Sequence, residues 1–179
     1  MLTAENTILA VIDFQGNLAQ AMADRTSLFE NAQKIIQGIR IFDIPLIVTE
    51  QMPAKLGSTL PEIANHIQGI SPISKESFSC CQNEVFMQTL KKTGRKQILL
   101  AGIETHICVY QTARDLLSAG YPVYIVSDAV SSRTSRNHEI GLQLIRDAGG
   151  TLTSTETVLF ELLKTAAHEK FKDIFKIVK

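Results

Sequence analysis

Three residues with catalytic chemistry follow short apolar segments of this chain: Asp13, Lys75 and Cys108. An ordinary thiol is only a few per cent ionised near neutral pH, although its thiolate is a strong nucleophile. A neighbouring lysine favours the thiolate, and a carboxylate can accept the thiol proton and later return it to a leaving group. A carboxylate, an amine and a thiol brought together therefore predict nucleophilic catalysis.

The position of Cys108 adds to this prediction. It falls in the first turn or so of a helix expected over residues 105–119. Unpaired backbone N–H groups and the helix dipole favour an anion there, so we expect a stabilised Cys108 thiolate. Each residue alone has a plainer explanation: Asp13 as a turn-capping residue, Lys75 as a solvated lysine and Cys108 as a buried, inert cysteine.

The elements that must position these residues alternate along the chain. Short runs rich in Ile, Val and Leu occupy residues 7–12, 45–49, 71–74, 97–101, 122–126 and 151–153. Segments with helical periodicity occupy residues 27–42, 83–92, 105–119, 135–148 and, as one or two helices, 155–178. Continuous apolar runs favour parallel strands buried on both faces. We predict one domain over residues 1–179, a three-layer α/β/α sandwich with a mostly parallel six-stranded sheet.

Charge and cysteine content limit the classes of partner and the cellular location that we expect. The chain has 18 Lys and Arg against 18 Asp and Glu, with no clustered basic face, so we expect no nucleic-acid partner. No apolar run approaches the ~20 residues of a membrane span, and the charges of the amphipathic tail are mixed, so we expect no membrane partner. Three cysteines, of which Cys80 and Cys81 are adjacent, do not form a disulfide framework. With no basic start of a targeting segment, this predicts a cytoplasmic location.

Nucleotide and metal motifs are absent from the sequence. No G-x-G-x-x-G follows the first apolar run, and no G-x-x-x-x-G-K-[ST] occurs. The four histidines show no metal-binding spacing. We therefore expect no cofactor and no metal.

Three segments resemble the isochorismatase-like family of cysteine hydrolases. They are AVIDFQ at residues 10–15, ISKESFSCC at 73–81 and AGIETHICVYQTA at 101–113. The last carries the G-x-x-[ST]-x-x-C-V pattern of the family. The segment VTEQMPAKLGSTLPEI at 48–63 resembles the subgroup of small isochorismatase-domain proteins without an assigned substrate.

The resemblance implies roles for particular residues. Asp13, Lys75 and Cys108 correspond to a catalytic triad, and the backbone N–H groups of Glu104 and Cys108 to an oxyanion hole. A non-proline cis peptide is implied between Ile103 and Glu104. The metal ligands of nicotinamidases have no counterpart, since no histidine occurs after residue 49 until His66. The resemblance also implies a homo-oligomer, a dimer or larger.

Five further residues are candidates for the substrate pocket: Phe14, Gln15, Glu50, Gln51 and Thr105. Each has a structural alternative, namely core packing for Phe14, loop hydrogen bonding for Gln15, a solvated loop for Glu50 and Gln51, and helix capping for Thr105. Cys80 and Cys81 are expected to pack at the start of a helix, and the sequence leaves open whether one of them lines the pocket.

The leading hypothesis is a metal-independent cysteine hydrolase that acts on a small amide or carbamoyl compound through a thioester. One alternative is a vinyl-ether hydrolase of the isochorismatase type, which needs Asp13 but no nucleophile. A second is a non-catalytic binding module on the same fold, since fold does not dictate function. A nuclease is weaker still, because the neutral charge gives no electrostatic footprint.

Overall fold

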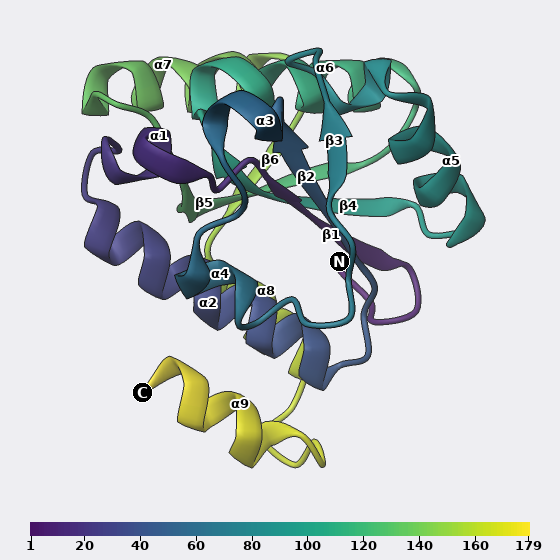
Figure 1. Cartoon of the computed structure of the whole chain (residues 1–179). Coiled ribbons are helices and arrows are strands. Elements are labelled where there is room, and N and C mark those ends of the chain that lie inside the picture. Colours follow the sequence, from purple (N-terminus) through teal and green to yellow (C-terminus); the bar gives the residue numbers. More distant parts are fainter.

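A six-stranded sheet forms the centre of the molecule in the computed structural model, which describes residues 1–179 (Figure 1). Its strand order is β3-β2-β1-β4-β5-β6, and every neighbouring pair is parallel. The strands are β1 (Thr7–Ile12), β2 (Leu46–Gln51), β3 (Ile73–Lys75), β4 (Gln97–Ile103), β5 (Val123–Ser131) and β6 (Thr151–Thr153). The predicted α/β sandwich is confirmed, and the sheet is wholly parallel.

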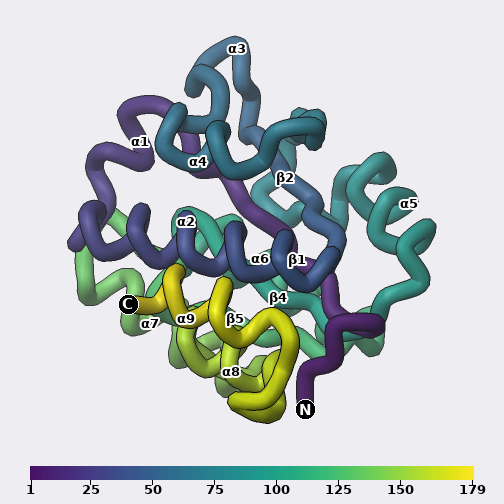
Figure 2. The backbone as a smooth tube through the Cα atoms, turned by 90° about the horizontal axis from the view of Figure 1, so that it is seen from below, coloured from purple at the N-terminus to yellow at the C-terminus, as the bar shows by residue number.

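Helices cover both faces of this sheet (Figure 1). One layer holds α2 (Arg25–Ile41), α4 (Pro61–Ala64) and α8 (Thr155–Leu163), and the other holds α5 (Glu84–Lys92), α6 (Tyr110–Ser118) and α7 (Ser135–Asp147). The tail forms a further helix, α9 (Phe171–Val178), which packs against α2 and α8 (Figure 2). The short helices α1 (Gly16–Gln20) and α3 (Pro53–Leu56) lie in the loops after β1 and β2. None of the helices combines the length and apolar composition that a membrane span requires.

The side chains of β1 show how the core is divided. Leu9 and Val11 belong to an apolar cluster with residues of α2 and α8, whereas Ile8, Ala10 and Ile12 belong to a second cluster with residues of α5 and α6. Successive residues of a strand point to opposite faces, so an uninterrupted apolar run fills both clusters. All six residues of β1 are buried.

The strand order reverses between β1 and β4, because the chain adds β2 and β3 on one side and β4 to β6 on the other. In open α/β sheets, ligands bind beyond the carboxyl ends of the strands at such a switch point. The loops after β1 and β4 therefore frame the expected site.

The predicted helix over residues 105–119 is not a single α-helix. Residues Thr105–Val109 form a π-helical turn, in which the N–H of Val109 donates to the carbonyl of Glu104 (3.2 Å), and α6 follows it. Such turns occur frequently at functional sites. Cys108 therefore lies inside this turn, which differs from the expected first turn of a regular helix.

Candidate functional site

Asp13, Lys75 and Cys108 converge at the carboxyl edge of the sheet. Asp13 follows β1 with a left-handed backbone (φ 54°), Lys75 ends β3, and Cys108 lies in the π-helical turn after β4. Lys75 Nζ lies 2.7 Å from Asp13 Oδ2, and the three residues are only 2%, 2% and 7% exposed in the order Asp13, Lys75, Cys108. The sheet topology thus brings together residues that are far apart in the sequence.

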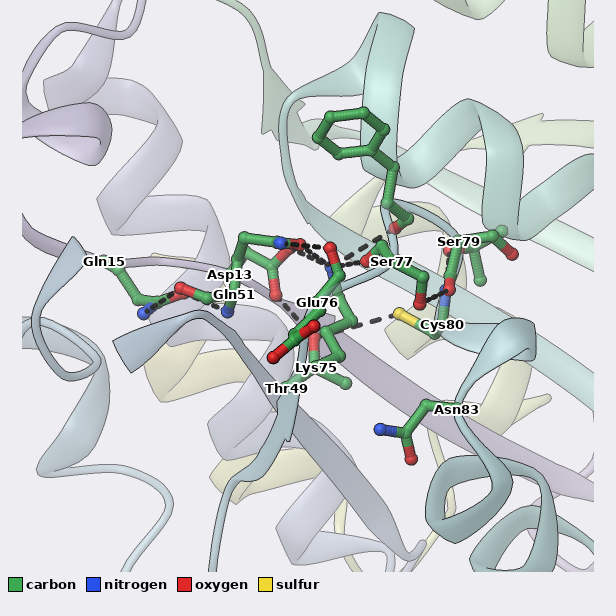
Figure 3. A network of polar contacts seen from close by, with 12 residues as sticks. Asp13, Gln15, Thr49, Gln51, Lys75, Glu76, Ser77, Ser79, Cys80 and Asn83 are labelled. Atoms are coloured by element: carbon green, nitrogen blue, oxygen red, sulfur yellow. Dashed lines mark hydrogen bonds and ion pairs between the residues drawn. The ribbon is translucent and has the colours of Figure 1, made fainter. Parts of the chain in front are cut away.

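The Lys75 ammonium is buried in a shell of oxygen atoms. Besides the Asp13 carboxylate, Nζ donates to Gln51 Oε1 (2.8 Å) and to the carbonyls of Ser77 (3.1 Å) and Phe78 (3.2 Å) (Figure 3). A buried charge is tolerated only when it is paired and hydrogen-bonded, as here. The alternative explanation of a solvated surface lysine is wrong.

The two carboxylate oxygens of Asp13 have different partners. Oδ1 accepts a hydrogen bond from the hydroxyl of Thr49 (2.7 Å), which also lies 3.8 Å from Cys80 Sγ (Figure 3). Oδ2 is ion-paired with Lys75 but accepts no hydrogen bond of good geometry. Oδ2 is therefore the oxygen with capacity left for a proton.

The Cys108 thiol does not rest as a thiolate. Burial is the largest influence and raises the pKa of Cys108 to about 12; the charge of Lys75 acts in the opposite direction, and the charge of Asp13 adds to the rise. Because Lys75 is already neutralised by Asp13, removal from water outweighs its effect. The expected resting thiolate is wrong: Cys108 rests as a neutral thiol that lines the same cavity as Asp13.

The remaining cysteines are also protonated. Burial raises the pKa of Cys80 to about 11 and that of Cys81 to about 12. They open the 3₁₀ turn Cys80–Gln82 just before α5, as expected, and neither of them lines the cavity beside Cys108.

Glu104 places its backbone at the same edge. The peptide bond between Ile103 and Glu104 is cis. The Glu104 carboxylate accepts hydrogen bonds from the backbone N–H (2.9 Å) and Nε (3.2 Å) of Arg133. No backbone or side-chain acceptor of the chain takes the Glu104 N–H. That amide is therefore available to an oxygen atom of a ligand.

A cavity of about 120 Å³ adjoins these groups. Its lining residues are Asp13, Leu18, Gln51, Leu56, Phe78, Ile103, Glu104, Ile107 and Cys108. A larger hollow of about 260 Å³ lies between α2, β5 and α7, but it contains none of the three converging residues. The smaller cavity is the candidate site, because Cys108 and Asp13 both line it.

The predicted pocket residues need correction, because only Gln51 lines this cavity. Phe14 is buried in the apolar core, with its ring edge-on to Phe29. The Gln15 amide binds backbone groups of Gln51 and Gly57, and so braces the loop.

Glu50 and Thr105 also have structural partners. Glu50 accepts hydrogen bonds from the N–H and hydroxyl of Thr59, both 2.7 Å. Thr105 is fully buried, and its hydroxyl lies 2.9 Å from His138 Nδ1, so it does not cap the helix. Both residues hold loops in place around the cavity.

The sequence does not identify the apolar residues that form the cavity walls. Leu18, Leu56, Phe78 and Ile107 come from α1, α3, the loop after β3 and the π-helical turn. Apolar side chains in loops carry no signal that separates a pocket wall from core. Exposure alone marks two of them, since Phe78 and Leu56 are 54% and 37% exposed.

Comparison with known proteins decides the family. The family model of the isochorismatase domain matches residues 7–157. The chain belongs to the isochorismatase family. This confirms the resemblance seen in the three sequence segments.

Individual members of the isochorismatase family match over nearly the whole chain. Isochorismatase domain-containing protein 2 of Danio rerio is 38% identical over 178 residues, covering 99% of this chain and 89% of the relative. The structure of MAR1 ribonuclease from Caenorhabditis elegans is 34% identical, with a TM-score of 0.93, covering 99% of this chain and 91% of that one.

The YcaC gene product of Escherichia coli, described as an octameric hydrolase of unknown specificity, shares the fold. Its TM-score is 0.93 at 22% identity, with 98% of this chain and 89% of that chain covered. The family model and these relatives place the chain in the isochorismatase family and leave its substrate open.

Proposed function

We propose that this chain is a cysteine hydrolase that cleaves a small amide or carbamoyl compound through a Cys108 thioester. One observation carries the proposal: Asp13, whose carboxylate is ion-paired with the Lys75 ammonium, lines the same cavity as the Cys108 thiol. A nucleophile needs a proton acceptor close by, and that acceptor needs a residue that orients it. In this site Cys108 is the nucleophile, Asp13 the proton acceptor and Lys75 the orienting residue.

In the first half of the reaction, Cys108 Sγ attacks the carbonyl carbon while its proton passes to Asp13 Oδ2. Transfer during attack suits a thiol whose pKa burial raises to about 12, because no standing thiolate is required. The proton then moves to the leaving nitrogen, the C–N bond breaks, and ammonia or an amine departs. The thioester remains on Cys108.

In the second half, Asp13 accepts a proton from water and the resulting hydroxide attacks the thioester. The C–S bond breaks, the proton returns to Sγ, and the carboxylic acid leaves. In both halves the developing oxyanion is bound by the N–H groups of Glu104 and Cys108. Such donors are worth ~2.7–4 kcal/mol each in acyl-transfer enzymes. Apart from the substrate and the attacking water, side chains and backbone of this chain supply every group in this path.

The alternatives predict different behaviour of one variant. A vinyl-ether hydrolase uses Asp13 without a nucleophile, so Cys108→Ala would remain active on isochorismate. A binding module would show no turnover at all. RNA must also be tested as a substrate, because one similar structure is that of a protein named MAR1 ribonuclease. The equal numbers of acidic and basic residues in this chain do not favour binding of a polyanion such as RNA.

The deciding experiment measures ammonia release by the full chain from a panel of small primary amides, with isochorismate and RNA as rival substrates. We expect amide turnover that Cys108→Ala lowers at least about 1,000-fold, as loss of a nucleophile does elsewhere. Intact-mass spectrometry of quenched reactions should show the acyl group on the unmodified chain and not on the variant.

Cys81→Ala is the matched control, because Cys81 is half-buried and lies outside the cavity. Its rate should stay close to that of the unmodified protein. Undiminished amide turnover by Cys108→Ala would contradict the thioester mechanism.

Assembly and location remain predictions. The homo-oligomer is tested by light scattering of the purified chain, and the cytoplasmic location by fractionation of the source cells. If light scattering shows a monomer, all residues around the cavity mouth must come from one chain.

A further inference from the structure

The cavity beside Cys108 is small and mostly apolar. Five of its lining residues are hydrocarbon in character: Leu18, Leu56, Phe78, Ile103 and Ile107. Its volume of about 120 Å³ lies below the ~300–1,000 Å³ of pockets for drug-sized ligands. A compact ligand therefore fits, and most of its surface would meet hydrocarbon.

The polar side chains of the lining are already engaged. Gln51 Oε1 accepts from Lys75 Nζ, and its Nε2 donates to the carbonyl of Glu76 (2.6 Å). The Glu104 carboxylate is held by Arg133. Beyond the reacting groups, these side chains leave little for a polar substituent of a ligand to bind.

A negatively charged substituent would lack a counter-ion in this cavity. None of the lining residues is a lysine or arginine. The nearby Lys75 Nζ already has four oxygen partners within 3.2 Å, one of them the Asp13 carboxylate. A second carboxylate beside Asp13 would be removed from water without compensation and repelled by its charge.

The cavity mouth continues the apolar surface. Phe78 and Leu56 line the cavity and are 54% and 37% exposed. Both are fixed through their backbones: the Phe78 carbonyl accepts from Lys75, and the Leu56 carbonyl lies so close to Gly16 that a side chain at position 16 would clash with it. An entering ligand thus meets two apolar side chains whose backbones are held in place.

We infer that the site takes an uncharged, compact amide or related carbonyl compound whose carbonyl carries a short apolar substituent. The inference rests on the proposed function, because it assigns what lies on the carbonyl side of the cleaved bond. The same features disfavour a dicarboxylate such as isochorismate.

Two probes of equal shape test this ligand class. 4-Methylpentanamide and succinamate (the 3-carboxypropanamide anion) differ in that an isopropyl group replaces a carboxylate. Each is titrated into the full chain carrying Cys108→Ser, and in parallel Cys108→Ala, so that binding is read without turnover. The signals are the ¹³C-labelled methyl groups of Ile103 and Ile107, which line the cavity.

We expect 4-methylpentanamide to shift both signals and to bind at least about tenfold more tightly than succinamate. Affinity should also rise from acetamide to butanamide by about tenfold or more, because each methylene entering an apolar pocket adds several-fold. Equal or tighter binding of succinamate, or no shift of either signal by the neutral probe, would overturn the inference.

A positive charge at the cavity mouth should weaken the preference for the neutral probe. Phe78→Arg supplies the missing counter-ion, so it should narrow the ratio between the probes by about tenfold or more. Phe175→Arg is the matched control, since Phe175 is 48% exposed on α9, outside the cavity. An equal change in both variants would contradict the role of Phe78. Probe binding without amide turnover by the unmodified chain would support the ligand class and contradict only the hydrolase.

Discussion

The Asp13–Lys75 pair combines full burial with a separation of 2.7 Å, and its side chains are at most 2% exposed. Breaking such a pair by removing one partner leaves an uncompensated buried charge, which typically costs about 3–5 kcal/mol. The pair is therefore a structural element of the site as well as a chemical one, and its energy can be measured without knowledge of the substrate.

We expect Lys75→Met to lower the free energy of unfolding by about 3–5 kcal/mol, because Asp13 then remains charged without a cation. Asp13→Asn should be similarly costly, since Lys75 loses its counter-ion. The double variant should be less destabilised than the sum of the two single changes. Urea unfolding of the four proteins measures this coupling, and additive effects would show that the pair contributes no interaction energy.

The residues of this pair were predictable from the sequence, whereas their surroundings were not. Asp13, Lys75 and Cys108 follow apolar runs, and a parallel sheet gathers such positions at one edge. The protonated state of Cys108 was not predictable, because burial depends on how the loops close over it. The position of Phe14 after the first strand makes it a pocket candidate, but in the structure its side chain is buried in the apolar core.

At the scale of elements, α7 fixes the π-helical turn that carries Cys108. Gly141 of α7 lies directly against this turn: a Cβ at position 141 would be 2.7 Å from the His106 nitrogen and 2.8 Å from the Thr105 carbonyl carbon. Two backbones approach closely here because glycine has no side chain. Because these contacts are with backbone atoms, the turn cannot move aside as the end of a flexible side chain could.

Gly141→Ala should therefore displace the turn and slow the reaction of Cys108. Overpacking typically costs about 1–3 kcal/mol, and a shift approaching 1 Å in a catalytic group can cost about 100-fold in rate. We expect amide turnover to fall at least about tenfold, and alkylation of Cys108 by iodoacetamide to fall by a similar factor relative to that of Cys81. Mass spectrometry of the alkylated peptides measures the second quantity.

Gly38→Ala is the control for this substitution. Gly38 lies within α2, and an added Cβ there meets the side-chain end of Leu159, on the other face of the sheet. This variant should lose stability while Cys108 keeps its reactivity. Equal effects of both variants on Cys108 would show that stability, and not the position of the turn, governs the site.

The elements differ in how far the sequence predicts them. Short apolar runs and helical periodicity correctly indicated six strands and the larger helices. The helices α1 and α3 have five and four residues, too few to display a helical period, yet they supply Leu18 and Leu56 to the cavity. The π-helical turn also escaped prediction, because its sequence pattern matches that of an α-helix.

At the scale of the whole molecule, the fold isolates all three thiols from water to different degrees. Burial raises the pKa of Cys80 to about 11 and those of Cys81 and Cys108 to about 12. In the unfolded chain these thiols ionise near pH ~8.5. Above that pH the unfolded state releases thiol protons that the folded state keeps. The stabilisation is complete below pH ~8.5 and is lost as the pH rises towards 11–12.

We therefore expect the free energy of unfolding to fall with rising alkaline pH, by up to about 1.4 kcal/mol per pH unit for each cysteine. Urea unfolding under reducing conditions at pH 7.5, 8.5, 9.5 and 10.5 measures the slope. Lysine and tyrosine also titrate in this range, so the slope must be compared with that of Cys80→Ala/Cys81→Ala/Cys108→Ala. The triple variant is less stable at pH 7.5 because of the cavities it creates, but its curve should be flatter above pH 8.5. Parallel curves would mean that the thiols ionise equally in both states, and the fold would then not hold Cys108 as the neutral thiol from which the proposed attack begins.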